Sequence, residues 1–211
     1  MTPRPTPADT RARLIEAARY LFWEKGYAAT GLADILARAG ANSGSFYHFF
    51  ESKDALLRTV LETYAEGIEP MLLAPVRAKA KHPLDEVTEL LASYRGRLAA
   101  TDCTYGCPIG RLALEIDPEN TPAHALIARN FDRWKAAVAD ALERAGVAAS
   151  KDTAVFVLTV MEGAVMQARA HRSLKPYDVC IRQLHDYLAT LVPRTSRRRR
   201  PLRASIPRSP R

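Results

Sequence analysis

The chain has 211 residues, of which 47% are hydrophobic and 26% are charged, as in an ordinary globular protein. No run approaches the roughly 18 consecutive apolar residues of a membrane helix, which argues against a membrane protein. The net charge of +8 comes from residues 193–211, which carry eight Arg and no acid. The rest of the chain is neutral in sum, so its basicity alone does not indicate a nucleic-acid partner.

The first residues, MTPRPTPADTRAR, lack the apolar core of a secretory signal, and we expect a cytoplasmic protein. Its three cysteines are then expected to be reduced thiols. Residues 1–8 contain three prolines and are expected to form a flexible arm.

Residues 9–55 are predicted to form three helices. Asp9 or Thr10 can cap the first helix, whose apolar residues recur at spacings of three and four and which Gly26 ends. A second helix ends at Gly40, and a third begins directly after it at Asn42 or Ser43. This order of helix, glycine turn and helix predicts a helix-turn-helix.

Residues 56–192 are predicted to form a helical body that begins within a helix capped by Ser52. Further helices are expected at roughly 84–100, 108–116, 122–145, 151–172 and 177–192. The stretch Ala154–Met161 has enough β-branched residues for a buried strand, but its apolar character continues to Met166, which favours a helix. The sequence therefore predicts an all-α fold of about nine helices, with a three-helix head and a C-terminal helical bundle.

The segment from Tyr27 to Leu56, YAATGLADILARAGANSGSFYHFFESKDAL, carries the most specific motif. It resembles the TetR (tetracycline repressor-like) family, whose pattern is close to GY..T...IA..AGVS.G.FY.HF..K..L. The matching positions are Gly26, Tyr27, Thr30, Ile35, Ala39, Gly40, Gly44, Phe46, Tyr47, Phe50, Lys53 and Leu56. The resemblance implies a homodimeric repressor that leaves a palindromic operator in double-stranded DNA when it senses a small molecule or an electrophile.

The third predicted helix begins with small polar residues, which suit entry into a major groove about 12 Å wide. Gly44 allows close approach of the backbone, and the Tyr47 phenol can donate to a phosphate. His48 is predicted equally well as a DNA contact or as a solvated surface residue, while Lys53 places a cation in the next helix. The predicted DNA-binding residues are Thr30, Asn42, Ser43, Gly44, Ser45, Tyr47, His48 and Lys53.

Three positions depart from the family pattern. Ser43 stands where a basic residue is frequent, Ala41 where a larger Val is usual, and Phe49 where His or Tyr is common. A helical hairpin around glycine also occurs in many all-α proteins that do not bind DNA. The agreement at many positions jointly favours DNA binding.

The segment CTYGCPIGRLALE, residues 103–115, is the sharpest feature of the C-terminal half. Pro108 suits the first position of a helix, so Cys107 is the predicted N-cap, where the helix dipole favours a thiolate. Arg111, one turn on, can add to this effect. The segment is similar to the stretch GC..GNLA.E of a TetR branch that includes the repressor of N-ethylmaleimide reductase, with Arg111 in place of Asn. That similarity implies sensing by Cys107.

Other roles for the cysteines stay open. Cys107 is also well explained as a passive buried residue, Cys103 can resolve a sulfenate at Cys107, and Cys180 suits packing. A thiol-dependent enzyme with Cys107 as nucleophile needs a histidine base nearby. No cofactor or metal is predicted, since only one Cys-x3-Cys pair exists and neither His124 nor His171 has finger-like spacing.

The remaining predictions concern a ligand pocket and a dimer interface. Ligand-pocket candidates, with plain core as the alternative, are Tyr64, Met71, Tyr94, Phe131, Trp134, Phe156, Met161 and Met166. An apolar stripe on the last helix predicts a four-helix dimer interface, with packing inside the chain as the alternative. This stripe consists of Tyr177, Ile181, Leu184, Leu188 and Leu191. Residues 193–211 are expected to be disordered, and either strengthen non-specific DNA binding or have no role.

Overall fold

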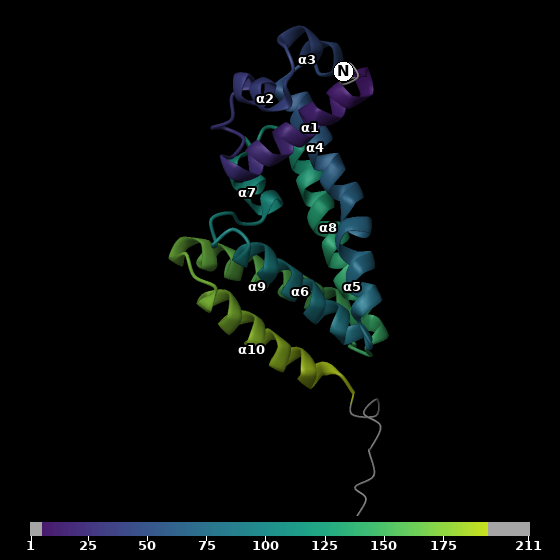
Figure 1. Cartoon of the computed structure of the whole chain (residues 1–211). Helices are drawn as coiled ribbons and strands as arrows, with labels where there is room; N and C mark the ends of the chain where they lie inside the picture. Colours follow the sequence, from purple (N-terminus) through teal and green to yellow (C-terminus); the bar gives the residue numbers. More distant parts are fainter. Residues whose placement is uncertain (1–5, 194–211) are drawn as a thin grey trace, which may run out of the picture.

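The computed structural model describes residues 6–193, which are helical and contain no strand (Figure 1). In chain order the helices are α1 (Pro7–Glu24), α2 (Leu32–Ala39), α3 (Ser43–Phe49), α4 (Lys53–Ile68), the π-helical turn η1 (Glu69–Leu73), α5 (Ala74–Lys79), α6 (Pro83–Ala99), α7 (Pro108–Glu115), α8 (Thr121–Arg144), α9 (Ser150–His171) and α10 (Lys175–Leu191). Because α4, η1 and α5 follow one another without a break, the described residues form nine helical rods. The predicted all-α fold of about nine helices is confirmed.

The first helix begins earlier than the sequence predicted. Thr6 is the N-cap: its side chain accepts a hydrogen bond from the backbone N–H of Asp9, whose carboxylate accepts one from the backbone N–H of Thr6. Pro7 fits the first turn because an N–H would have no partner there. Asp9 is therefore not the cap but the third helical residue of a capping box, and the arm predicted over residues 1–8 is too long.

The head consists of α1, α2 and α3, gathered at one end of the molecule (Figure 1). Its core contains Leu14, Phe22, Ile35 and Phe46, each at most 1% exposed. Gly26 follows α1 with φ +93°, a left-handed conformation that suits glycine, and so ends the helix as predicted. The predicted boundaries within the head follow from these local signals.

A long rod of α4, η1 and α5 connects the head to the body (Figure 1). The sequence patterns gave no helix between Pro70 and Pro83, yet the rod continues through Pro70 and Pro75. Proline lacks the N–H that the helical ladder requires, and the wider π turn of η1 accommodates the interruption. This segment was missed because proline normally ends a helical pattern.

The body is built from α6, α8, α9 and α10, with α7 between the head and the body (Figure 1). The ambiguous stretch at residues 154–161 is part of α9, as predicted. Among the described residues, no helix has both the length and the apolar character needed to cross a lipid bilayer. The C-terminal end of α10 and helix α3 lie at opposite ends of the molecule (Figure 1). The prediction for the Arg-rich segment after Pro193 lies outside the described residues.

The apolar stripe of α10 does not form an exposed interface. Tyr177, Leu184 and Leu188 are at most 2% exposed within the single chain, and the Tyr177 hydroxyl donates to the Leu91 backbone oxygen at 2.8 Å. Ile181 and Leu191 are half-buried against the same core. The alternative of packing inside the chain is therefore correct for this stripe, because α10 needs an apolar face to cover α9 and α6.

A different face of α9 and α10 exposes large apolar side chains. Its members are 42–59% exposed: Val155, Phe156, Met166, Val179 and Tyr187. The Phe156 and Tyr187 rings meet edge to face, with centroids 5.5 Å apart, so the two helices share one continuous outer surface. Exposed apolar surface of this kind is typical of an interaction site.

Candidate DNA-binding head and ligand cavity

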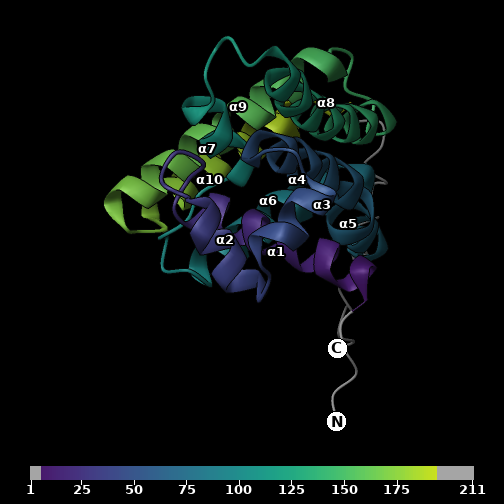
Figure 2. The ribbon, with the colours of Figure 1, turned by 90° about the horizontal axis from the view of Figure 1, so that it is seen from above.

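Helix α3 presents its polar residues to solvent. Asn42 is the N-cap and accepts a hydrogen bond from the Ser45 backbone N–H at 2.8 Å. Ser43, Gly44 and His48 are exposed, Tyr47 is 60% exposed, and Ser45 is half-buried. Seen from above, the head lies nearest the viewer and the body helices lie behind it (Figure 2). Helix α3 is thus open on the face that the sequence predicted for DNA.

Two predicted DNA-binding residues, Thr30 and Lys53, have structural roles within the head. Thr30 is fully buried, and its hydroxyl donates to the Gly26 backbone oxygen at 2.6 Å. The Lys53 ammonium donates to the backbone oxygens of Tyr27 and Thr30, both at 3.0 Å, and lies 4.2 Å from the centroid of the Tyr27 ring. The carbonyls of the α1–α2 loop have no helical donors, so this cation satisfies them. In this structure the Thr30 side chain is buried and Lys53 is bonded within the head, and the predicted DNA contacts of both residues stay predictions.

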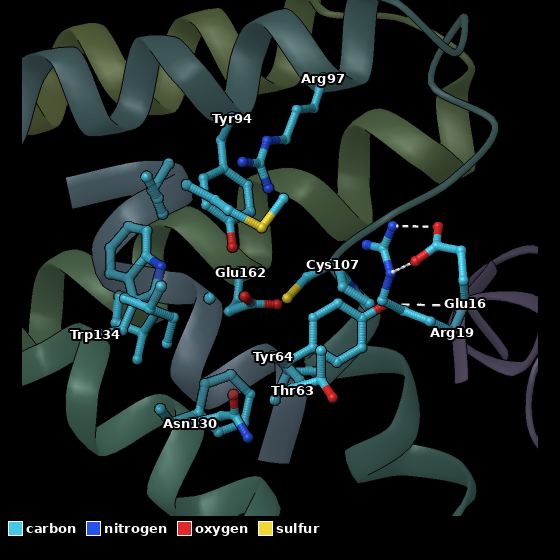
Figure 3. Close-up of a pocket in the computed structure, with 18 residues that line it drawn as sticks. Glu16, Arg19, Thr63, Tyr64, Tyr94, Arg97, Cys107, Asn130, Trp134 and Glu162 are labelled. Carbon is cyan, nitrogen blue, oxygen red and sulfur yellow. Dashed lines mark hydrogen bonds and ion pairs between the residues drawn. The ribbon is translucent and has the colours of Figure 1, made fainter. Parts of the chain in front are cut away.

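A cavity of about 220 Å³ lies below the head, between α4, α6, α7, α8 and α9 (Figure 3). Five of the predicted pocket residues line it: Tyr64, Met71, Tyr94, Phe131 and Trp134. The other three do not. Met161 is fully buried outside the lining, while Phe156 and Met166 are about half exposed on the outer face of α9. Periodicity could not reveal which side of this largely apolar helix faces the cavity.

A second cavity of about 260 Å³ adjoins the first. The two share six lining residues, which are Arg19, Tyr64, Met71, Tyr94, Arg97 and Pro108. The second cavity reaches Trp23 of α1 and Tyr105 of the α6–α7 loop. Both cavities are therefore lined in part by α1, the first helix of the head.

Cys107 caps α7 as predicted, but its thiol is not activated. Its sulfur accepts a hydrogen bond from the Gly110 backbone N–H at 3.4 Å. Burial, followed by the negative charge of Glu162, holds the pKa of Cys107 well above its ordinary range. These effects outweigh the hydrogen bonds from the helix N-terminus, so the predicted thiolate is wrong. Burial and Asp102 likewise raise the pKa of Cys103, whereas Cys180 is half-buried.

Glu162 is a cavity residue that the sequence analysis missed. Figure 3 shows its carboxyl beside the Cys107 thiol in the middle of the cavity. Burial raises the pKa of Glu162, and the hydrogen bond with Cys107 partly opposes this shift. Between Ala154 and Ala168 it is the one charged residue. A lone carboxylate in so apolar a helix is costly to bury, and this signal could have identified it.

Arg111 connects α7 to the end of α1 instead of acting on Cys107. Its guanidinium donates to the backbone oxygens of Glu24, at 3.2 Å, and Lys25, and to the Glu115 carboxylate at 2.7 Å. The same carboxylate accepts the backbone N–H of Tyr27 at 2.7 Å. Four unsatisfied carbonyls end every helix, and a cation there is also favoured by the helix dipole. The predicted support of a thiolate by Arg111 is thus replaced by a clamp on α1.

The loop before α7 is attached to α1 as well. The Trp23 indole N–H donates to the Gly106 backbone oxygen at 2.8 Å, and the Tyr105 hydroxyl bonds to the Glu24 carboxylate at 3.1 Å. A Cβ atom at Gly26 would lie 2.3 Å from a carboxylate oxygen of Glu115, so only glycine fits against the clamp. The first turn of α7 lines the cavity, while Arg111 and Glu115 further along α7 bind the end of α1 and the residue Tyr27 that follows it.

The surroundings of Cys107 do not support nucleophilic catalysis. No histidine is among the described residues that line the cavity, and the raised pKa of the thiol disfavours its reactive form. Within residues 6–193, no group of three or more His, Cys, Asp or Glu side chains is placed to hold a metal ion.

Comparison with known proteins agrees with this geometry. The family description "Bacterial regulatory proteins, tetR family" matches residues 14–60, and "Transcriptional regulator LmrA/YxaF-like, C-terminal domain" matches residues 83–183. The fold is similar to the reduced form of Escherichia coli NemR, with a TM-score of 0.73 at 22% identity over 87% of this chain and 97% of that one. A TetR transcriptional regulator from Chloroflexus aurantiacus has a TM-score of 0.76 at 27% identity over 88% and 97%.

Full-length relatives extend the likeness to the whole chain. An uncharacterised HTH-type transcriptional regulator of Mycobacterium tuberculosis is 32% identical over 195 residues, which cover 89% of this chain and 98% of the relative. The regulator LmrA of Bacillus subtilis is 25% identical over 171 residues, covering 80% and 90%. The chain therefore belongs to the TetR family of helix-turn-helix transcriptional regulators, with a C-terminal domain of the LmrA/YxaF-like type.

Proposed function

We propose that the protein is a homodimeric repressor that binds a palindromic operator through α3 and releases it when a small molecule enters the cavity. The observation that carries this proposal is the position of α7. Cys107, Pro108 and Ile109 line the cavity, whereas Arg111 and Glu115 hold the end of α1. A ligand that displaces the first turn of this eight-residue helix moves the clamp, and with it the head.

The exposed face of α3 supports the DNA-binding role. Asn42, Ser43, Gly44 and Ser45 open the helix and are small enough to approach base edges. Tyr47 lies on the same exposed helix, where its hydroxyl can donate to a phosphate. Two such helices in a dimer would meet half-sites about 34–36 Å apart.

The outer face of α9 and α10 supports the homodimer. Phe156, Met166, Val179 and Tyr187 are exposed in the single chain and lie on two adjacent helices. A second copy placed on this face would bury them in a four-helix arrangement. This face replaces the buried stripe of α10 as the proposed interface.

The structure favours a non-covalent inducer over an electrophile. The Cys107 thiol is buried and its raised pKa keeps it protonated, so an electrophile meets a poor nucleophile. The cavity itself offers aromatic walls of the kind that bind small organic molecules.

The test is selection of bound sequences from a random DNA library with the purified protein. We expect enrichment of a palindrome, and at least tenfold weaker binding of it by Tyr47→Ala measured by fluorescence anisotropy. Lys151→Ala, an exposed change on α9, serves as the control and should bind as the wild type does. Recovery of no palindrome, or equal affinity of the Tyr47 variant, would contradict the proposal.

A further inference from the structure

Two buried acceptors that line the cavity have no hydrogen-bond donor from the described protein. They are Oε1 of Glu162 and Oδ1 of Asn130, and both residues line the cavity (Figure 3). A buried polar atom without a partner costs stability, so its retention calls for an explanation. A ligand that donates hydrogen bonds provides one.

The orientation of the Asn130 amide is determined by its neighbours. Its nitrogen donates to the backbone oxygens of Leu61, at 3.0 Å, and Leu126, at 2.8 Å. Both partners are acceptors only, so the amide cannot be turned over and Oδ1 must remain the free atom. Asn130 is 2% exposed, which places this acceptor deep in the protein.

The backbone of α7 leaves room for the Glu162 carboxyl. A Cβ atom at Gly110 would lie 2.5 Å from Oε2 of Glu162, so the glycine in the first turn of α7 leaves room for the carboxyl. The Cys107 thiol lies beside this carboxyl (Figure 3), and Oε1 of Glu162 has no hydrogen-bond partner among the described residues.

The other charges at the cavity do not reverse its polarity. Arg19 is paired with Glu16 through two hydrogen bonds of 2.6 and 2.8 Å, which cancels both charges. Arg97 is exposed and lies 5.6 Å from the centroid of the Tyr94 ring, so water screens it. With Arg19 paired and Arg97 exposed, Glu162 is the acidic group of the lining that no cation of the lining neutralises.

Aromatic rings complete this end of the cavity. Tyr94 and Trp134 meet edge to face with centroids 5.4 Å apart, and Phe131 and Tyr64 also belong to the lining. Aromatic faces attract organic cations, and their apolar area binds a hydrophobic body.

We propose that the cavity binds an organic amine, with an apolar or aromatic body against Trp134 and Tyr94 and a protonated nitrogen that donates to Glu162, while Asn130 accepts a further donor. This ligand class rests on the proposed sensor function. It assigns recognition of the ligand's positive charge to Glu162, a residue of this chain, and not to a feature of the family as a whole.

Three probes of nearly equal shape test the charge. They are 1-naphthylmethylamine, 1-naphthylmethanol and 1-naphthoate, titrated into the full-length protein by isothermal calorimetry at pH 7. We expect the ammonium to bind at least tenfold more tightly than the alcohol and the carboxylate to bind more weakly than both. Equal or tighter binding of the carboxylate, or no binding of the ammonium at millimolar concentration, overturns the proposal.

Variants of Glu162 test the assigned residue. Glu162→Gln should lower the affinity for the ammonium at least tenfold and change that for the alcohol by less than threefold. Glu162→Asp keeps the charge and should retain the preference for the ammonium. Glu66→Gln, on the exposed side of α4, should leave all three affinities unchanged. An unaltered preference for the ammonium in Glu162→Gln refutes the assignment.

The same three probes show whether the proposed ligand class and the proposed sensor function fail together or separately. Anisotropy of bound operator DNA is followed while each probe is added. If the ammonium binds but leaves the DNA bound, the ligand class stands and the sensor function fails. If the carboxylate releases the DNA, the sensor function stands and the ligand class fails.

Discussion

Truncation of Arg111 should uncouple α7 from the head. In Arg111→Ala, the backbone oxygens of Glu24 and Lys25 lose their charged donor, and the Glu115 carboxylate keeps only the N–H of Tyr27. The end of α1 then has unsatisfied carbonyls next to a carboxylate whose cation is gone.

The size of the effect follows from the geometry. A hydrogen bond to a charged group contributes about 1.5–3 kcal/mol, and the Arg111 side chain is 18% exposed, so water recovers part of the loss. We expect the free energy of unfolding to fall by about 2–3 kcal/mol. For a chain of this length, this lowers Tm by about 4–12 °C.

Differential scanning calorimetry measures the shift, with Arg144→Ala as the matched control. Arg144 also binds two carboxylates, Glu86 and Asp140, but these contacts lie within α8 and between α8 and α6, and they involve no residue of the head. Because Glu86 is 15% exposed and accepts two hydrogen bonds from Arg144, Arg144→Ala should also lower Tm, but it should leave the operator affinity unchanged. The operator affinity of Arg111→Ala should fall as well, since α1 is no longer held in one position. No loss of operator affinity in Arg111→Ala relative to Arg144→Ala would refute the clamp.

Four further outcomes are expected. Because burial raises the pKa of Cys107 above the ordinary 9.0, N-ethylmaleimide should modify it more slowly than Cys180 at pH 7, and its rate should still be rising above pH 9, as measured by peptide mass mapping. Phe156→Arg should convert the dimer into a folded monomer in sedimentation experiments, since it places a charge in the proposed interface. Lys53→Met should lower Tm but leave the slope of log K for DNA against log salt unchanged, whereas a lost phosphate contact would reduce that slope by about 0.9. Burial raises the pKa of Glu162 above 4.5, so the folded state binds this proton more tightly than the unfolded state. The resulting stabilisation is present below pH 4.5 and is lost as the pH rises through the raised pKa. Glu162→Gln should therefore flatten the decline of the unfolding free energy with pH in denaturant titrations.

Each of these has a contradicting result. They are preferential labelling of Cys107 at neutral pH, an intact dimer of Phe156→Arg, a reduced salt slope for Lys53→Met, and the same pH profile of stability in Glu162→Gln as in the wild type.

The helices and the head could be predicted from the sequence because their signals are local. Gly26 ends α1, Ser52 caps α4 and Pro108 begins α7, and each depends on backbone chemistry within one turn. The helix-turn-helix was recognised because its motif is confined to about thirty consecutive residues. Even here the failure at Pro70 shows that a local rule misses a helix when a π turn accommodates the proline.

The sites depended on contacts between distant segments, which no local pattern contains. Lys53 reaches carbonyls 23 and 26 residues away, and Arg111 reaches the end of α1 across 86 or more residues, so the sequence pattern could not reveal these partners of either cation. A helix-capping position favours a thiolate, yet at Cys107 the burial imposed by surrounding helices raises the pKa instead. Periodicity identifies an apolar face but not what covers it. Only the packing of α9 against α8 and α10 decided that Glu162 faces the cavity and Phe156 faces outward, because burial is a property of the assembled helices.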